Sequence, residues 1–183
     1  MNFDKILQGR RSIRKYKKKA IPWKKLAFIL DAARYSPSAG NLQNWRFIVV
    51  DKEELKDKIT SACLGQKWMN KAPIHIVVCS DNSTIDKFYK SSKFPTQNCA
   101  VAIQNIMLKA HTFGIGSCWV GAFDERAIKR DLKIPGNVSV EAVITLGYSD
   151  QKLTMPRRLD LGTLLSFNEF GNKDSDSMFP LKK

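Results

Sequence analysis

The spacing of apolar residues along the chain alternates between the two periods that distinguish strands from helices. Short runs of β-branched and aromatic residues predict strands at Trp45–Val50, Pro73–Val78, Ser117–Val120 and Val138–Tyr148. Apolar residues at steps of three and four predict helices over Met1–Arg11, Pro22–Tyr35, Lys52–Cys63, Thr96–Phe113 and Asp124–Leu132. Residues 81–95 are polar and irregular, and we expect only a short helix or a loop there.

Turn and cap residues separate these elements. Pro22 suits the first turn of a helix, Gly114 is placed to end the long helix, and Asp124 can cap the next one. The order of helices and strands favours a three-layer sandwich of the α/β or α+β class. No GxGxxG follows a strand, which disfavours a Rossmann dinucleotide fold. We find no repeat and no convincing domain boundary, so the 183 residues suit a single domain.

Composition is that of a globular enzyme, with 43% apolar and 26% charged residues. No apolar run approaches the ~20 residues of a membrane span, and no apolar segment follows the basic N-terminus. We therefore expect a soluble, cytoplasmic protein without a membrane partner. The net charge of +14 is unusual. A basic patch can bind nucleic acid, an acidic protein or an anionic cofactor, but we interpret Lys17–Lys19 as a solvated surface.

The cysteines and histidines do not form a recognisable metal motif. Cys63, Cys79, Cys99 and Cys118 include no CxxC pair, and the two histidines, His75 and His111, do not have zinc-ligand spacing. Apolar neighbours favour buried free thiols in a reducing compartment. We expect no metal site.

Three segments could carry chemistry. Arg10–Arg14 places three arginines and a serine where they could bind a phosphate, or could simply interact with the end of their own helix. Ser36–Trp45 combines small residues with Asn41 and Gln43, whose side chains could form hydrogen bonds with a heterocycle or with hydroxyl groups. A plain connecting loop has similar residues, and a tryptophan such as Trp45 is more often a core residue than a stacking platform. Gly114–Asp124 joins a helix, a strand and the next helix start, where backbone N–H groups can face an electron-rich ligand.

Taken together, the segments closely resemble the nitroreductase family of FMN-dependent oxidoreductases. The similarity is carried by RRSIRKY (10–16), AARYSPSAGNLQNWRF (32–47), APIHIVV (72–78), NCAVAIQNIMLKAHTFGIGSCWVGAFD (98–124), LGYSD and MPRR (146–158). The resemblance implies an α+β fold, a three-layer α/β/α sandwich with a mixed, mainly antiparallel sheet, in a homodimer with FMN at the subunit interface. The chain is then a short, compact member.

The resemblance also implies roles for individual residues. Arg10, Arg11 and Ser12 would hold the FMN phosphate, with Arg157 or Arg158 adding charge, and Arg14 would lie near the pyrimidine edge. Pro37, Ser38, Ala39, Asn41 and Gln43 would contact FMN from the partner subunit. Val120, Gly121 and Ala122 would line the flavin, with the backbone of Gly121 near N5, and Gln66 would touch the ring. Arg14 and Gly121 are the expected catalytic positions.

The chain departs from the family pattern at three places. Asn44 stands where the family commonly has proline, and Asn98 stands where the long helix often begins with aspartate. The connection over residues 81–95 is short, which would leave the site more open. The segment 159–183 carries apolar residues that need cover, and we expect it to pack on the partner subunit, with a looser polar stretch at Asn172–Ser177.

The implied activity is hydride transfer from NADH or NADPH through flavin N5 to an electron-poor small-molecule acceptor, such as a nitroaromatic or a quinone, in a ping-pong cycle. Because the flavin performs the redox step, the protein needs no nucleophile of its own. The alternatives are a related flavin enzyme (a dehalogenase, an azoline oxidase or a flavin-fragmenting enzyme) and a non-enzymatic basic binding module. Such a module could bind nucleic acid, a partner that we do not expect for this chain.

Overall fold

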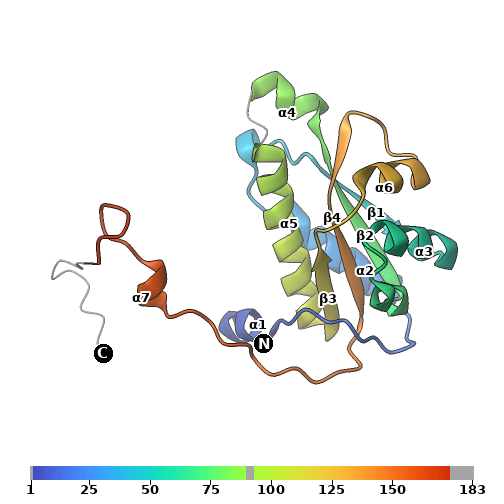
Figure 1. The fold of residues 1–183 in the computed structure, drawn as a ribbon, viewed down its shortest axis with the longest axis horizontal. Coiled ribbons are helices and arrows are strands. Elements are labelled where there is room, and N and C mark those ends of the chain that lie inside the picture. The colour runs from blue at the N-terminus through green and yellow to red at the C-terminus, as the bar shows by residue number, and fades with distance from the viewer. Residues whose placement is uncertain (1, 90–92, 174–183) are drawn as a thin grey trace. The chain divides into compact units, whose positions relative to one another are not determined.

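The computed structural model describes residues 2–89 and 93–173, and the chain divides into two compact units, Met1–Leu153 and Thr154–Lys183. The larger unit is built on β1 (Trp45–Val50), β2 (Ile74–Asp81), β3 (Ile115–Val120) and β4 (Val138–Tyr148) (Figure 1). These form a four-stranded sheet in the order β1-β2-β4-β3, and each pair is antiparallel. A single parallel bridge joins Ser12 to Ser117 among the described residues. The expected mainly antiparallel sheet is therefore confirmed.

Helices cover both faces of this sheet. On one face, α2 (Trp23–Asp31) and α5 (Lys93–Thr112) bury a cluster that includes Ile76, Val78 and Ile144. On the other, α3 (Glu53–Ala62) and α6 (Glu125–Asp131) pack over Val77 and Val143. Alternate residues of a strand point to opposite faces, so the almost fully buried β2 contributes to both clusters. The expected three-layer α/β/α sandwich is confirmed.

Element boundaries differ from the sequence prediction where a cap or a pairing extends an element. Within the polar stretch 81–95, α4 (Asn82–Phe88) forms because the Asp81 carboxylate accepts a hydrogen bond from the N–H of Ser83, and Ile85 is fully buried. The long helix α5 begins at Lys93, before the predicted Thr96. In β3, pairing with Tyr148 of β4 extends the strand back to Ile115.

Shorter elements complete the larger unit. They are α1 (Phe3–Gly9) and three 3₁₀ turns at Ala32–Tyr35, Ala39–Asn41 and Lys67–Lys71. Trp45 is buried in the core, as expected. Pro22 caps α2 from just outside, where its fixed φ of −59° still suits the helix start.

The second unit contains α7 (Leu161–Leu164), whose Asp160 cap accepts a hydrogen bond from the N–H of Gly162. Its apolar side chains are largely exposed, with 70% exposure at Leu159 and 64% at Leu164. Residues 174–183, which include most of the predicted loose stretch, lie outside the described residues. In the described ranges, no helix combines the length and the apolar character that a bilayer crossing requires.

Candidate functional site

The segment Arg10–Tyr16 leaves α1 and runs along the outer edge of β3. The N–H of Ile13 donates to the carbonyl of Ser117 at 2.9 Å, and the N–H of Lys17 donates to the carbonyl of Tyr148 at 2.9 Å. The sheet edge therefore holds the first predicted segment directly against the third, although the two are a hundred positions apart in the sequence.

Two glycines make this close approach possible. A Cβ atom at Gly116 would lie 2.5 Å from Cγ1 of Ile13, and one at Gly147 would lie 2.6 Å from Cδ1 of Tyr16. Both distances are far below van der Waals contact, so any larger residue would push the arginine segment away from the sheet. Gly116 thus has a positioning role that its spacing in the sequence did not reveal.

Arg10 and Arg11 line a cavity of about 240 Å³ at the end of α1, together with His111 and the Gly114–Ser117 segment. The residues that line it include no Asp or Glu. Burial, followed by the positive charges of Arg10 and Arg11, lowers the pKa of His111. The neutral imidazole is therefore favoured beside the two guanidinium groups, and the cavity as a whole suits an anion.

Arg10, Ser12 and Arg14 also gather around the buried thiol of Cys118 on β3. Burial raises the pKa of this thiol, while the charge of Arg14, a hydrogen bond with Ser12 and the charge of Arg10 act in the opposite direction. Three of the predicted ligand residues are therefore close enough to act on one atom of β3.

Arg14 lies over an aromatic ring that the sequence prediction did not include. Its guanidinium carbon is 5.7 Å from the centroid of Trp68, and Trp68 packs against Ile13, Tyr16 and Ala72. A cation over an indole face is attracted by the ring quadrupole, so Trp68 restrains an exposed arginine.

Gln66 precedes Trp68, and its side-chain amide donates to the carbonyl of Cys63 at 3.1 Å. The N–H of Asp124 donates to the carbonyl of Ala62 at 2.8 Å, which joins the Val120–Ala122 segment to the same turn. Val120 is buried, whereas Gly121 and Ala122 are exposed at the end of β3. Gln66 and this strand end therefore belong to neighbouring parts of one surface.

The loop Ser36–Asn44 is held in an unusual backbone conformation. Gly40, Asn41 and Gln43 have φ values of 55°, 55° and 48°. The side-chain amide of Gln43 donates to the Oδ1 of Asn41 at 3.2 Å, and the hydroxyl of Ser38 accepts from the N–H of Gln43 at 3.1 Å. Pro37 and Asn41 are exposed, while Ser38 and Ala39 are half-buried.

The two departures from the family pattern, Asn44 and Asn98, form a buried pair. The Nδ2 of Asn98 donates to the Oδ1 of Asn44 at 2.8 Å, and the Oδ1 of Asn98 accepts from the N–H of Ala39 at 3.0 Å. Farther along α5, the Nδ2 of Asn105 donates to the hydroxyl of Ser36 at 2.8 Å. The loop is thus fastened to α5 at Asn98 and at Asn105.

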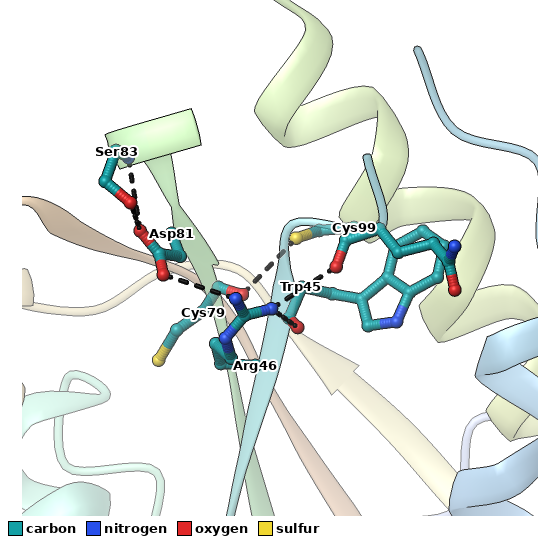
Figure 2. A network of polar contacts seen from close by, with 7 residues as sticks. Trp45, Arg46, Cys79, Asp81, Ser83 and Cys99 are labelled. Atoms are coloured by element: carbon teal, nitrogen blue, oxygen red, sulfur yellow. Dashed lines mark hydrogen bonds and ion pairs between the residues drawn. The ribbon is translucent and has the colours of Figure 1, made fainter. Parts of the chain in front are cut away.

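Arg46 fastens the other end of the loop. Its guanidinium donates to the carbonyls of Gln43 and Trp45 at 3.3 and 2.9 Å and to the carboxylate of Asp81 at 3.3 Å (Figure 2). The same carboxylate accepts from the N–H and hydroxyl of Ser83. The buried start of β1 and the Arg46–Asp81 ion pair therefore fix the position at which the loop ends and the strand begins.

Within one chain, the Ala39 end of this loop and the arginine segment lie at different points along α5. The loop bonds to Asn98, whereas Arg10 and Arg11 act on His111, about thirteen residues further on or roughly 20 Å along the helix. They also flank opposite edges of the sheet, because β1 and β3 are its outer strands. The structure therefore brings the first and third predicted segments together and keeps the second apart from them.

Arg157 and Arg158 belong to the separate unit Thr154–Lys183, where both are exposed. The four cysteines are free and buried, as expected, and burial raises the thiol pKa to about 12 for Cys63 and Cys99. Across the described ranges, no group of three or more His, Cys, Asp or Glu is arranged to hold a metal ion.

Sequence reasoning missed Trp68, His111 and Gly116 as parts of this site. His111 carried one usable signal, its position at the end of the long helix that Gly114 closes. Trp68 and Gly116 carried none, since their roles depend on contacts with Arg14 and Ile13 from a distant part of the chain.

Comparison with known proteins gives consistent results. The sequence model described as the Nitroreductase family matches residues 7–82 and 60–148. A protein of Archaeoglobus fulgidus provisionally named NADH dehydrogenase/NAD(P)H nitroreductase is 40% identical over 157 residues, covering 81% of this chain and 86% of that protein. A Methanothermobacter thermautotrophicus protein with the same name is 38% identical, covering 81% and 78%. The solved structure of an FMN-dependent nitroreductase from Clostridium difficile has a TM-score of 0.79 and 33% identity, covering 90% of this chain and 98% of its own.

Proposed function

Since this chain belongs to the nitroreductase family and is an oxidoreductase, we propose that it uses FMN to reduce an electron-poor small molecule, such as a nitroaromatic or a quinone, with NADH or NADPH as donor. The observation that carries the proposal is the pairing of the Arg10–Arg14 segment with β3, through the Ser12–Ser117 bridge and the hydrogen bond from Ile13 to Ser117, beside a cationic cavity.

The residues present fit an FMN phosphate. The cavity at Arg10 and Arg11 is lined without carboxylates, and a guanidinium fork matches phosphate oxygens in geometry and charge. Gly114 lines the cavity, and a Cβ atom there would meet no other atom within 4 Å, so open space lies beside its backbone. Arg157 or Arg158 would add charge from the second unit.

Bound FMN would supply hydride transfer between the nicotinamide and the acceptor. Arg14, held over Trp68, would stabilise negative charge at the pyrimidine edge of the ring. The exposed backbone of Gly121 and Ala122 would orient the ring near its N5 atom, with Val120 and Gln66 beside it. No side chain has to donate or accept a proton in this scheme, which agrees with buried, neutral thiols and scarce histidines.

A second copy of the chain would complete the site. The loop with Pro37, Ser38, Ala39, Asn41 and Gln43 is held by hydrogen bonds, and its contact with Asn98 lies roughly 20 Å along α5 from His111 in the arginine cavity. In a homodimer the loop of one copy could meet the arginine segment of the other. The exposed Leu159 and Leu164 of the second unit would find cover on the partner.

Absorbance spectroscopy of the purified protein tests the cofactor, because bound FMN gives a yellow protein with quenched flavin fluorescence. A colourless protein that does not quench the fluorescence of added FMN would instead favour a non-enzymatic basic binding module. Steady NAD(P)H oxidation with a nitroaromatic, with parallel double-reciprocal lines, is expected for a shared-site ping-pong cycle. Intersecting lines would refute the cycle, and turnover only in dehalogenation, azoline oxidation or flavin cleavage would favour the related chemistries.

A further inference from the structure

A second cavity, of about 730 Å³, lies apart from the arginine cavity and shares no lining residue with it. We name it the lysine cavity, and it is lined by Tyr16, Lys17, Lys18, Lys19, Ala20, Glu53, Lys56, Asn70, Lys71, Ala72, Pro73 and Asp150. Its volume falls in the range of small-molecule sites, roughly 300–1,000 Å³. Four separate stretches of chain converge on it, so it is a built feature of the fold.

The lining is strongly cationic. Five lysines face two carboxylates, and one of these, Glu53, is already engaged by Lys56. The ammonium of Lys19 lies 4.6 Å from the ring centroid of Tyr148, which leaves Lys17, Lys18 and Lys71 as exposed cations around the cavity. Like charges brought together repel one another, and a multivalent anion would relieve that repulsion.

Lys56 lies in the wall of the lysine cavity, and its side chain is only 2% exposed. Its Nζ donates to the Oε1 of Glu53 at 2.8 Å and to the carbonyl of Ala72 at 3.0 Å. An ammonium has three N–H groups, and these contacts use two of them. Burying a charged group is costly, and the contacts with Glu53 and Ala72 offset part of that cost. Lys56 therefore adds a fixed positive charge to the wall, while the exposed Lys17, Lys18 and Lys71 can reach a ligand.

We propose that the lysine cavity binds the phosphoryl groups of a small molecule. A lysine ammonium group binds phosphate as a point charge, so it does not need the planar, two-pronged alignment that an arginine guanidinium uses. The volume exceeds that of a single phosphate and suits a molecule of nucleotide size. Two sources share this chemistry, the 2′-phosphate of NADPH and a free phosphorylated compound. NADPH as one of these sources, and FMN as the ligand that fills the arginine cavity during the test, rest on the proposed function, whereas the binding of phosphoryl groups by the lysine cavity does not.

Isothermal titration calorimetry with inorganic pyrophosphate tests the cavity, using the full chain saturated with FMN so that the arginine cavity is occupied. The variant Lys18→Gln/Lys71→Gln removes two exposed cations and leaves Lys56 in place. Lys87→Gln/Lys133→Gln is the matched control, since both lysines are exposed and neither lines the cavity. Thermal melts should show that both variants remain folded.

The wild type and the control should bind pyrophosphate alike, and the cavity variant should bind roughly five- to thirtyfold more weakly. No binding by the wild type, or equal loss in both variants, would overturn the proposal. A higher KM for NADPH but not for NADH in the cavity variant would identify the 2′-phosphate as the source. Weaker pyrophosphate binding with both KM values unchanged would identify a free phosphorylated compound. Because the calorimetry involves no redox step, its outcome is separate from that of the proposed function.

Discussion

Replacing Asn98 tests how this chain tolerates its two departures from the family pattern. Asn98→Ala would remove the hydrogen bonds to the N–H of Ala39 and to the Oδ1 of Asn44, at 3.0 and 2.8 Å. Asn44 and Asn98 are 2% and 4% exposed, so water cannot easily replace the lost partners. Each buried group left unsatisfied costs about 1–3 kcal/mol. We expect Asn98→Ala to lower the free energy of unfolding by about 2–4 kcal/mol, and Asn44→Ala by about 1–3 kcal/mol.

A double-mutant cycle measured by urea unfolding isolates the pair itself. A neutral hydrogen bond contributes about 0.5–1.5 kcal/mol, so the double variant should be less destabilised than the sum of the single variants by that amount. Additivity within about 0.3 kcal/mol would show that the two asparagines do not interact, and the reasoning would fail.

The same pair makes a prediction about the restored family residue. In the described residues, the Nδ2 of Asn44 has no hydrogen-bond partner. A flip of the Asn44 amide would let it donate to a carboxylate, so Asn98→Asp should be milder than Asn98→Ala. Since Asn98 holds the Ser38–Asn41 loop, Asn98→Ala should also release FMN more readily than the matched core variant Ile59→Ala. Equal FMN retention at equal stability would remove the loop from the binding site.

Four further changes have defined outcomes. Arg10→Ala should weaken FMN binding about ten- to a hundredfold, because a charge-assisted contact with the phosphate contributes about 1.5–3 kcal/mol. Riboflavin, which has no phosphate, should bind almost as before. Fluorescence quenching measures both affinities, and equal losses of affinity for the two ligands would make Arg10 structural. Gly116→Ala should destabilise the protein by about 1–3 kcal/mol in thermal melts through its clash with Ile13. Because Ile13→Ala removes the two Cγ atoms that the new Cβ would meet, the double variant should be less destabilised than the sum of the two single variants; an unchanged melting temperature in Gly116→Ala would contradict the packing argument. Burial lowers the pKa of His75 to about 4, so the unfolded state, with a pKa near 6.5, binds the proton more readily. The free energy of unfolding should therefore fall by up to about 3 kcal/mol as the pH falls from about 6.5 to 4. Urea unfolding of His75→Gln should lack most of this pH dependence, and an identical slope in the variant would exclude His75 as its source. Deleting residues 159–183 should weaken both dimerisation and FMN retention, measured by light scattering with flavin quantitation, whereas a dimer with full FMN would show that the extension is dispensable.

Much of the fold could be predicted from the sequence because its signals are local. The period of apolar residues placed all four strands, and β4 spans the predicted Val138–Tyr148. Gly114, with a φ of 69°, and the cap residue Asp124 marked a helix end and a helix start, as predicted. These features depend on side chains a few positions apart, where propensity and periodicity act directly.

The sequence by itself also singled out Arg10, Ser12 and Arg14, since clustered arginines beside a hydroxyl are legible in one short stretch. Only the tertiary structure decided their surroundings. The edge of β3 placed them beside Cys118, and Trp68 came to lie under Arg14, across more than fifty positions. Such contacts depend on strand order and loop closure, which no local pattern encodes.

Asn44 and Asn98 illustrate the same limit, because two separate departures in the sequence are one buried hydrogen bond in the molecule. Lys17–Lys19 show it again. The sequence predicts a solvated, charged surface for these lysines, and they are exposed in the structure. The fold also places them around a cavity that the buried Lys56 lines, which the sequence did not reveal. A side chain's chemistry is fixed by its type, whereas its partners are set by the packing of distant segments, and only the packed chain brings those together.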